Sequence, residues 1–289
     1  MKKLLLMAAV VYSGNLLAQQ KLVTQAIVNT TTTVVAPSDE EDVSSIQTQG
    51  EGRISFRNFA DGETKSVTYL KNDLVKTVTK NDMGRTTAIR DNAKKVTTTL
   101  MEMMGNKTGV YATDEDQANM RKRVDSMMQA TRNSADTSTR RMARPQDVPT
   151  EIAYTEETKK IAGYTCKKAY VVSTRFLGIK DSAIAWYAPE IKLQNISSTG
   201  GLSGFGNFGG SSSTSALSKI DGFVMRYETK MGRGRTMTTE VTKLDLAKEV
   251  ADKEFEIPKD FDVKPMKDMQ NNVQFSGGSV PGRTIIRMN

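Results

Sequence analysis

Apolar and polar side chains alternate along much of this chain, and this alternation limits the possible folds more than any other feature. In the run 223–230, Phe223, Met225 and Tyr227 fall on one side of a strand and charged residues fall on the other. Strands with one wet face are typical of antiparallel sheets, because parallel strands are covered on both faces. About a dozen such runs are expected on this period-two pattern, and the others begin near Ala26, Glu51, Val67, Leu74, Arg85, Val96, Lys107, Glu151, Thr165, Ser182 and Arg235.

These runs predict one β-rich domain over residues 19–262. Two stretches without apolar periodicity are expected to be inserted loops, a polar and basic one at 133–149 and a Gly/Ser-rich one at 194–218. Residues 263–289 contain several prolines and glycines and are expected to form a mobile tail.

One amphipathic helix is expected to begin near Asp114. Thr113 is a suitable N-cap, and Asp116 is the acidic residue three places on that completes a capping box. An apolar stripe then recurs at helical spacing, made by Met120, Val124, Met127, Met128 and Thr131. Because the sheet is the only large partner for this stripe, the fold class is mainly β (α+β). We expect a curved antiparallel half-open barrel, with the helix packed on its concave face.

The first 18 residues have the pattern of a secretory leader. Two lysines precede a nine-residue apolar stretch, and a small residue, Ala18, stands before Gln19. The stretch is too short to span a bilayer, which takes about 20 residues. We therefore expect cleavage near Ala18/Gln19, a periplasmic or secreted location, and no transmembrane segment.

The chain contains no histidine and one cysteine, Cys166. This composition excludes His-based catalytic triads, His-ligated metal centres, internal disulfides and multi-Cys clusters. We expect no metal and no cofactor. Cys166 lies in a β-rich run and is expected to be a small buried hydrophobe, although an intermolecular disulfide stays open as an alternative.

Methionine is abundant, with 16 residues, and it gathers on two elements expected to face each other. Met101 and Met103 lie on one strand, whereas Met120 and Met127 lie on the helix. Methionine side chains adapt to irregular apolar spaces, so this gathering fits either a plain core or a pocket for an apolar ligand. A thioether site for Cu(I) is a third interpretation of the same residues.

Two further motifs suggest ligands less directly. Residues 204–209 read GFGNFG and match the dinucleotide fingerprint, but no strand precedes them and no helix follows, so a loop is favoured. The basic residues Arg140, Arg141 and Arg144 could contact an anionic headgroup. Nucleic acid is not an expected partner, because the basic positions lack interleaved aromatics.

Four fragments together resemble the GLPGLI-type secreted proteins and their uncharacterised envelope relatives. They are residues 157–169 (ETKKIAGYTCKKA), 186–191 (WYAPEI), 220–225 (IDGFVM) and 255–261 (FEIPKDF). The GLPGLI string itself is missing. The resemblance implies a half-open antiparallel barrel similar to the LolA-type lipoprotein carriers, and it implies no catalytic residues.

These observations predict a non-enzymatic exported envelope protein that binds a lipid or other apolar molecule between sheet and helix. The alternative is a structural or interaction module with a dry core and a protein partner in the envelope. For the first function, the residues expected to line the apolar cleft are Met101, Met103, Met120, Val124, Met127, Phe223 and Met225.

Overall fold

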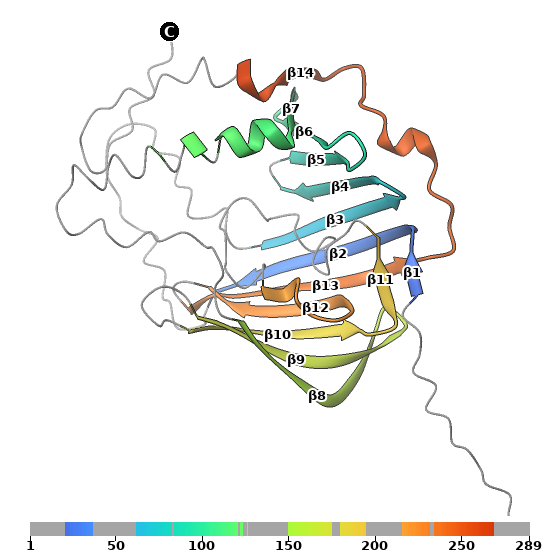
Figure 1. The fold of residues 1–289 in the computed structure, drawn as a ribbon, viewed down its shortest axis with the longest axis vertical. Helices are drawn as coiled ribbons and strands as arrows, with labels where there is room; N and C mark the ends of the chain where they lie inside the picture. Colours follow the sequence, from blue (N-terminus) through green and yellow to red (C-terminus); the bar gives the residue numbers. More distant parts are fainter. Residues whose placement is uncertain are drawn as a thin grey trace, which may run out of the picture.

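The fold was analysed in a computed structural model, which describes residues 21–36, 62–82, 84–120, 122–123, 126, 150–174, 180–194, 216–231 and 234–268 (Figure 1). The expected leader, the strand expected from Glu51, and the loop at 133–149 lie outside these residues. Most of the loop at 194–218 and of the tail at 263–289 also lies outside them.

The described chain is mainly β, as expected from the alternation. Its elements are β1 Lys21–Val23, β2 Gln25–Val35, β3 Gly62–Lys71, β4 Leu74–Asn81, β5 Gly84–Asp91, β6 Val96–Met103, β7 Asn106–Thr113, β8 Thr150–Ile161, β9 Tyr164–Thr174, β10 Lys180–Ala188, β11 Ile191–Leu193, β12 Phe223–Lys230, β13 Thr236–Asp245, the short 3-10 helix η5 Asp252–Phe255, and β14 Asp262–Pro265.

Twelve strands form one sheet in the order β14-β7-β6-β5-β4-β3-β2-β13-β12-β10-β9-β8. Neighbours in this sheet are antiparallel, except that β14 pairs with β7 in parallel. The sheet is strongly twisted and its end strands β8 and β14 are not paired with each other, so it stays open (Figure 1). A separate parallel ribbon of β1 and β11 crosses it.

The main core lies on one face of strands β2, β3, β8, β9, β10, β12 and β13, which we call the core region. Val28, Leu70 and Met225 are fully buried on this face, which we call the core face. The β1–β11 ribbon covers it with Val23, Ile191 and Leu193, and residues 216–220 add Ala216, Leu217 and Ile220. Ala216 and Leu217, expected to lie at the end of a loop, therefore belong to the core because their side chains are apolar and buried.

Hydroxyl groups also line the core face, and they pair across strands. The oxygens of Thr32 and Thr239 lie 2.9 Å apart, and those of Thr68 and Thr77 lie 3.0 Å apart. The abundance of threonine thus satisfies two requirements, since a β-branched side chain suits a strand and its hydroxyl finds a partner when buried.

In strands β4–β7, which we call the strap region, the buried side chains of β5 and β6 lie on the opposite face of the sheet, whereas Ala112 of β7 is buried on the core face. Residues paired across neighbouring strands point to the same face of the sheet. Leu70 pairs with Val75, and Val75 pairs with Arg90, so Arg90 lies on the core face and its neighbour Ile89 lies on the opposite face. Ile89 and Leu100 are nevertheless the buried residues of β5 and β6. We call this second face the strap face.

The strap face is covered by residues 246–265, which we call the strap. Two lysines of the sheet hold it, with Lys71 Nζ 2.6 Å from Asp252 Oδ1 and Lys107 Nζ 2.5 Å from Asp260 Oδ2. Phe255 of η5 is buried in the strap region. Residues 246–248 form a bend that leads towards η5.

The strap ends in β14, so the boundary of the expected tail lies further along the chain than residue 263. Strand β14 can pack beside β7 because residue 109 of β7 is glycine. A Cβ at Gly109 would lie 2.8 Å from Leu100 Cδ2 and 2.8 Å from Val263 Cγ2. The missing side chain lets Val263 pack above Leu100.

The helix expected from Asp114 begins at that residue and is described continuously to residue 120. The capping box is present: Thr113 Oγ1 accepts a hydrogen bond from the Asp116 N–H at 3.0 Å, and Asp116 Oδ2 accepts one from the Thr113 N–H at 3.0 Å. Arg90, on the core face, forms a two-pronged ion pair with Asp114. The helix therefore starts on the side of the sheet opposite the strap.

The free edge strand β8 is interrupted by a register shift between Tyr154 and Thr158. Beyond the shift, Lys159 and Lys160 are exposed. No helix among the described residues is long and apolar enough to cross a membrane.

Candidate binding site

The methionines expected to line a cleft share a face of the sheet but are not gathered in one place. Met101 and Met103 lie on the core face of β6, where their exposed fractions are 37% and 43%. Met225 lies on the same face of β12, with β5, β4, β3, β2 and β13 between the two strands. Met120, on the helix, is 42% exposed.

Phe223 and Met225 are fully buried in the main core, so they are packed interior and do not line an open cleft. Met101 and Met103 are separated from them by five strands and are partly exposed, so the described members of the expected set differ in burial and position. Val124, Met127, Arg140, Arg141 and Arg144 lie outside the described residues.

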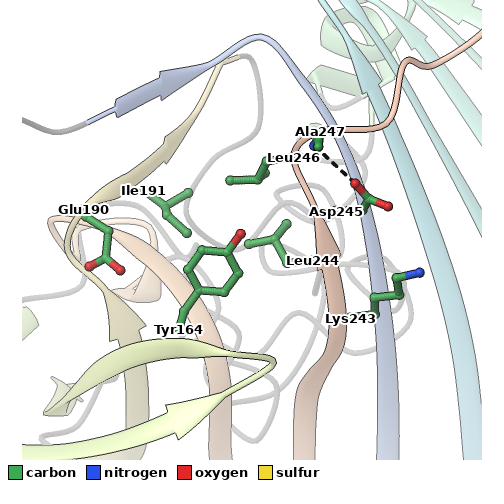
Figure 2. A pocket seen from close by; sticks show the side chains of 8 residues that line it. All are labelled: Tyr164, Glu190, Ile191, Lys243, Leu244, Asp245, Leu246 and Ala247. Carbon is green, nitrogen blue, oxygen red and sulfur yellow. Dashed lines mark hydrogen bonds between the residues drawn. The ribbon is translucent and has the colours of Figure 1, made fainter.

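The structure places an open hollow elsewhere, at the end of the core region where β13 and β9 approach the β1–β11 ribbon (Figure 2). Its volume is about 720 Å³. The residues that line it come from three separate parts of the chain, and they are Tyr164, Glu190, Ile191, Lys243, Leu244, Asp245, Leu246 and Ala247.

Two turns shape the walls of the hollow. Tyr164 follows a tight turn in which Ala162 and Gly163 have φ angles of 48° and 89°. At the end of β13, Asp245 Oδ1 accepts hydrogen bonds from the N–H groups of Ala247 at 3.1 Å and Lys248 at 3.0 Å. This Asx-type turn stops the strand and brings Leu246 beside Leu244 at the hollow.

The side of the hollow around Tyr164 is apolar. Figure 2 shows Ile191, Leu244 and Leu246 gathered around the Tyr164 hydroxyl. Leu244 and Ile191 also belong to the main core, which makes this wall continuous with the rigid interior. The apolar wall is thus fixed by packing, whereas its opening faces solvent.

Two carboxylates flank this wall. Glu190 and Asp245 lie on either side of Tyr164 in Figure 2, and the Lys243 ammonium points away from them. Both acids are half-buried, and among the described residues neither forms an ion pair. The hollow therefore combines an apolar wall with negative charge that no described side chain of this protein neutralises by contact.

The pKa shifts around the hollow follow from this arrangement. Burial raises the pKa of the Tyr164 phenol, and the nearby Asp245 and Glu190 carboxylates raise it further. Hydrogen bonds from the Lys248 and Ala247 N–H groups lower the pKa of Asp245, which keeps this carboxylate ionised at neutral pH. The hollow is negative under ordinary conditions.

Cys166 lies two residues from Tyr164 and is fully buried. Burial, assisted by the Glu190 carboxylate, raises the pKa of its thiol to about 12. A protonated, buried thiol is neither a nucleophile nor able to reach a second chain, which argues against the intermolecular disulfide left open above.

The described residues contain no group of three or more His, Cys, Asp or Glu side chains placed to hold a metal ion. The hollow pairs no nucleophile with a base. What its geometry supports is binding, through apolar contact on one wall and charge on the flanks.

Sequence reasoning missed the hollow because its residues form no local motif. Tyr164, Glu190 and Ile191 all lie in fragments that carry the family resemblance, and those fragments do not indicate a binding hollow. One signal was available: the alternation of β13 ends at Asp245, and an aspartate side chain favours a turn because it can accept hydrogen bonds from nearby backbone N–H groups.

No family model matches this chain, and no curated protein matches it either. Among solved structures, two crystal forms of PNGF-II are similar, at 14% and 12% sequence identity with TM-scores of 0.36 and 0.35. Each covers 86% of this chain, which spans about a third (32% and 33%) of PNGF-II.

An outer membrane lipoprotein-sorting protein domain from Vibrio parahaemolyticus is also similar, at 7% identity and a TM-score of 0.27, covering 83% of this chain and 92% of that domain. These likenesses are distant. The fold described above rests on the strand pairings of this chain, and the resemblance to GLPGLI-type proteins stays a resemblance.

Proposed function

We propose that this protein is a non-enzymatic, exported envelope protein that binds a lipid or other apolar molecule. The observation that carries the proposal is the hollow, whose apolar side is formed by the half-buried Leu246 beside the largely buried core residues Ile191 and Leu244. Its volume of about 720 Å³ lies within the range of about 300–1,000 Å³ that ligand pockets occupy.

The binding place in this proposal differs from the one expected from the sequence. Binding between sheet and helix required an accessible cleft lined by methionines, and the described members of that set are divided between a packed core and an exposed surface. The hollow offers the same apolar chemistry on a wall that is already held in place.

A structural or interaction module with a dry core is the second candidate. The full burial of Phe223 and Met225 favours it, because the core region holds no accessible space above these residues. In that case the hollow would be a surface irregularity without a ligand.

Titration with the neutral fluorescent probe N-phenyl-1-naphthylamine separates the two candidates. A binder should show saturable fluorescence enhancement. Leu246→Arg should weaken it at least about tenfold, since burying a leucine against a ligand contributes about 1.5–3 kcal/mol.

Ile257→Arg is the matched control, because Ile257 is a similarly apolar, exposed residue that does not line the hollow. Binding should survive this change. No saturable binding, or equal losses in the two variants, would favour the interaction module.

A further inference from the structure

We propose that the hollow selects a small amphiphile that carries a cationic nitrogen on its apolar chain. This inference rests on the proposed function and adds the charge of the ligand to it. It is argued from the unpaired carboxylates, the direction of Lys243 and the continuity of the apolar wall.

The first step concerns charge. A half-buried carboxylate loses part of its hydration and is normally matched by an ion pair or by several hydrogen bonds. Asp245 accepts two backbone N–H bonds through one oxygen, Oδ1. Glu190 has no ion pair among the described residues, although elsewhere on the sheet acids such as Glu157 and Glu240 are paired.

The second step concerns the cations of this protein near the hollow. Lys243 is the one lysine or arginine among the residues that line it. Its side chain is exposed, and in Figure 2 its ammonium lies beyond Asp245, on the side away from Tyr164 and Glu190. Lys243 and Lys248 are near enough to Asp245 to contribute to the lowering of its pKa. Among the described residues no lysine or arginine forms an ion pair with Glu190, so an entering cation would meet the charge of this carboxylate.

The third step concerns the shape of the ligand. Tyr164 lies between the two acids, and Ile191, Leu244 and Leu246 surround its hydroxyl (Figure 2). Ile191 and Leu244 are largely buried and Leu246 is half-buried, so an apolar chain would contact mainly Leu246 while its charged end reaches a flanking carboxylate. The phenol oxygen adds a hydrogen-bond acceptor for an ammonium N–H.

An anionic amphiphile, such as a fatty acid, would place its carboxylate beside Glu190 or Asp245. Like charges at this range repel, and the hollow excludes part of the water that would screen them. The same arrangement therefore favours an ammonium over a neutral head and a neutral head over a carboxylate.

Three ligands with the same ten-carbon chain test this order: decylammonium, decanol and decanoate, each displacing N-phenyl-1-naphthylamine from the purified protein. Decylammonium should bind about tenfold more tightly than decanol, which corresponds to two partly exposed ion pairs. Decanoate should bind more weakly than decanol.

Glu190→Gln and Asp245→Asn assign the preference to these acids. Each should reduce the advantage of decylammonium over decanol about threefold, because the two carboxylates share the tenfold preference. The asparagine oxygen can still accept the Ala247 and Lys248 N–H bonds, and the melting temperature of each variant will show that the fold persists. Glu256→Gln, an exposed acid away from the hollow, is the control and should change nothing.

The outcomes separate this inference from the proposed function. Equal affinities for decylammonium and decanol, or an unaltered preference in both variants, would overturn the cation selectivity and leave an apolar binding site. Failure of all three ligands to displace a saturably bound probe would overturn the cation selectivity alone, and absence of saturable probe binding would overturn both proposals.

Discussion

The core region and the strap region belong to one continuous sheet, yet they bury opposite faces. In the core region, the face that carries Val28 and Leu70 is closed by the β1–β11 ribbon and residues 216–220. In the strap region, the face that carries Ile89 and Leu100 is closed by the strap. Strand β4, half-buried along most of its length on both faces, is where the change occurs.

The comparison teaches that strand alternation alone does not determine which side of a sheet is interior. Thr87 and Ile89 are buried on one face of β5, and Arg90 lies on the other face, where it pairs with Asp114 at the start of the helix. The alternation in the sequence would be the same whichever of these faces were covered. The covering segment decides. In the core region that segment is itself rich in apolar residues, whereas the strap is held by a few apolar side chains and by lysine–acid pairs.

The largest expected difference between the two regions should appear when one large buried side chain is removed from each. Phe223→Ala should lower the free energy of unfolding by about 3–5 kcal/mol, because the rigid core cannot fill the cavity. Phe255→Ala should cost less, about 1–3 kcal/mol, because the strap can detach locally while the sheet persists. Urea denaturation of both variants measures the difference. Equal losses would mean that the strap is as integral as the core.

The second test uses pH and concerns the core region, where Cys166 lies. Its folded-state pKa of about 12 exceeds the ordinary thiol value of 9.0, so the unfolded chain ionises first as the pH rises. The free energy of unfolding should be insensitive to this thiol below about pH 9 and then fall by up to about 1.4 kcal/mol per pH unit. The fall should continue towards pH 12.

Cys166→Ala should remove that contribution, so the wild-type and variant stability curves should converge or cross above pH 9. Tyrosines with raised pKa values, such as Tyr227, act in both proteins and cancel in the difference. Parallel curves for the two proteins up to pH 11 would show that the thiol is not buried in the folded state.

The smallest expected effect concerns the strap region alone. Gly109→Ala would push a methyl group against Leu100 and Val263, and should cost about 1–3 kcal/mol by lifting β14 from β7. Hydrogen exchange should report faster exchange of the β14 amides, with the core strands unchanged.

Adding Val263→Ala should recover part of this loss, since it removes one of the two colliding groups. If the double variant is less stable than Gly109→Ala by the full cost of losing Val263, the contact at Gly109 does not position the strap.

Much of the fold could be predicted from the sequence, because local alternation is a strong signal. The run 223–230 is β12 to the residue, and the capping box at Thr113 and Asp116 is formed as its spacing indicates. The separation of the methionines of β6 from Met225 of β12 was not predictable, because it depends on the five strands that lie between β6 and β12 in the sheet. Strand order depends on long-range pairing, which a single sequence does not encode locally.

The hollow could not be predicted for a related reason. Tyr164, Glu190 and Asp245 come together only because β9, β11 and β13 end near one another, and each is an ordinary strand-end residue when viewed alone. The parallel pairings of β1 with β11 and of β14 with β7 were also missed. Strands β1 and β11 have three residues each and β14 has four, too few for a period to be visible.

The register shift in the edge strand β8 affects how the protein behaves at high concentration. An open sheet with two straight edge strands can pair with a strand of a second copy, and repeated pairing of this kind leads to fibres. Here one rim is bent by the register shift near Tyr154 and flanked by lysines, and the other is capped by the short β14. Polymerisation through strand addition is thereby opposed at both ends, so that the molecule can leave its sheet unclosed without becoming a seed for aggregation.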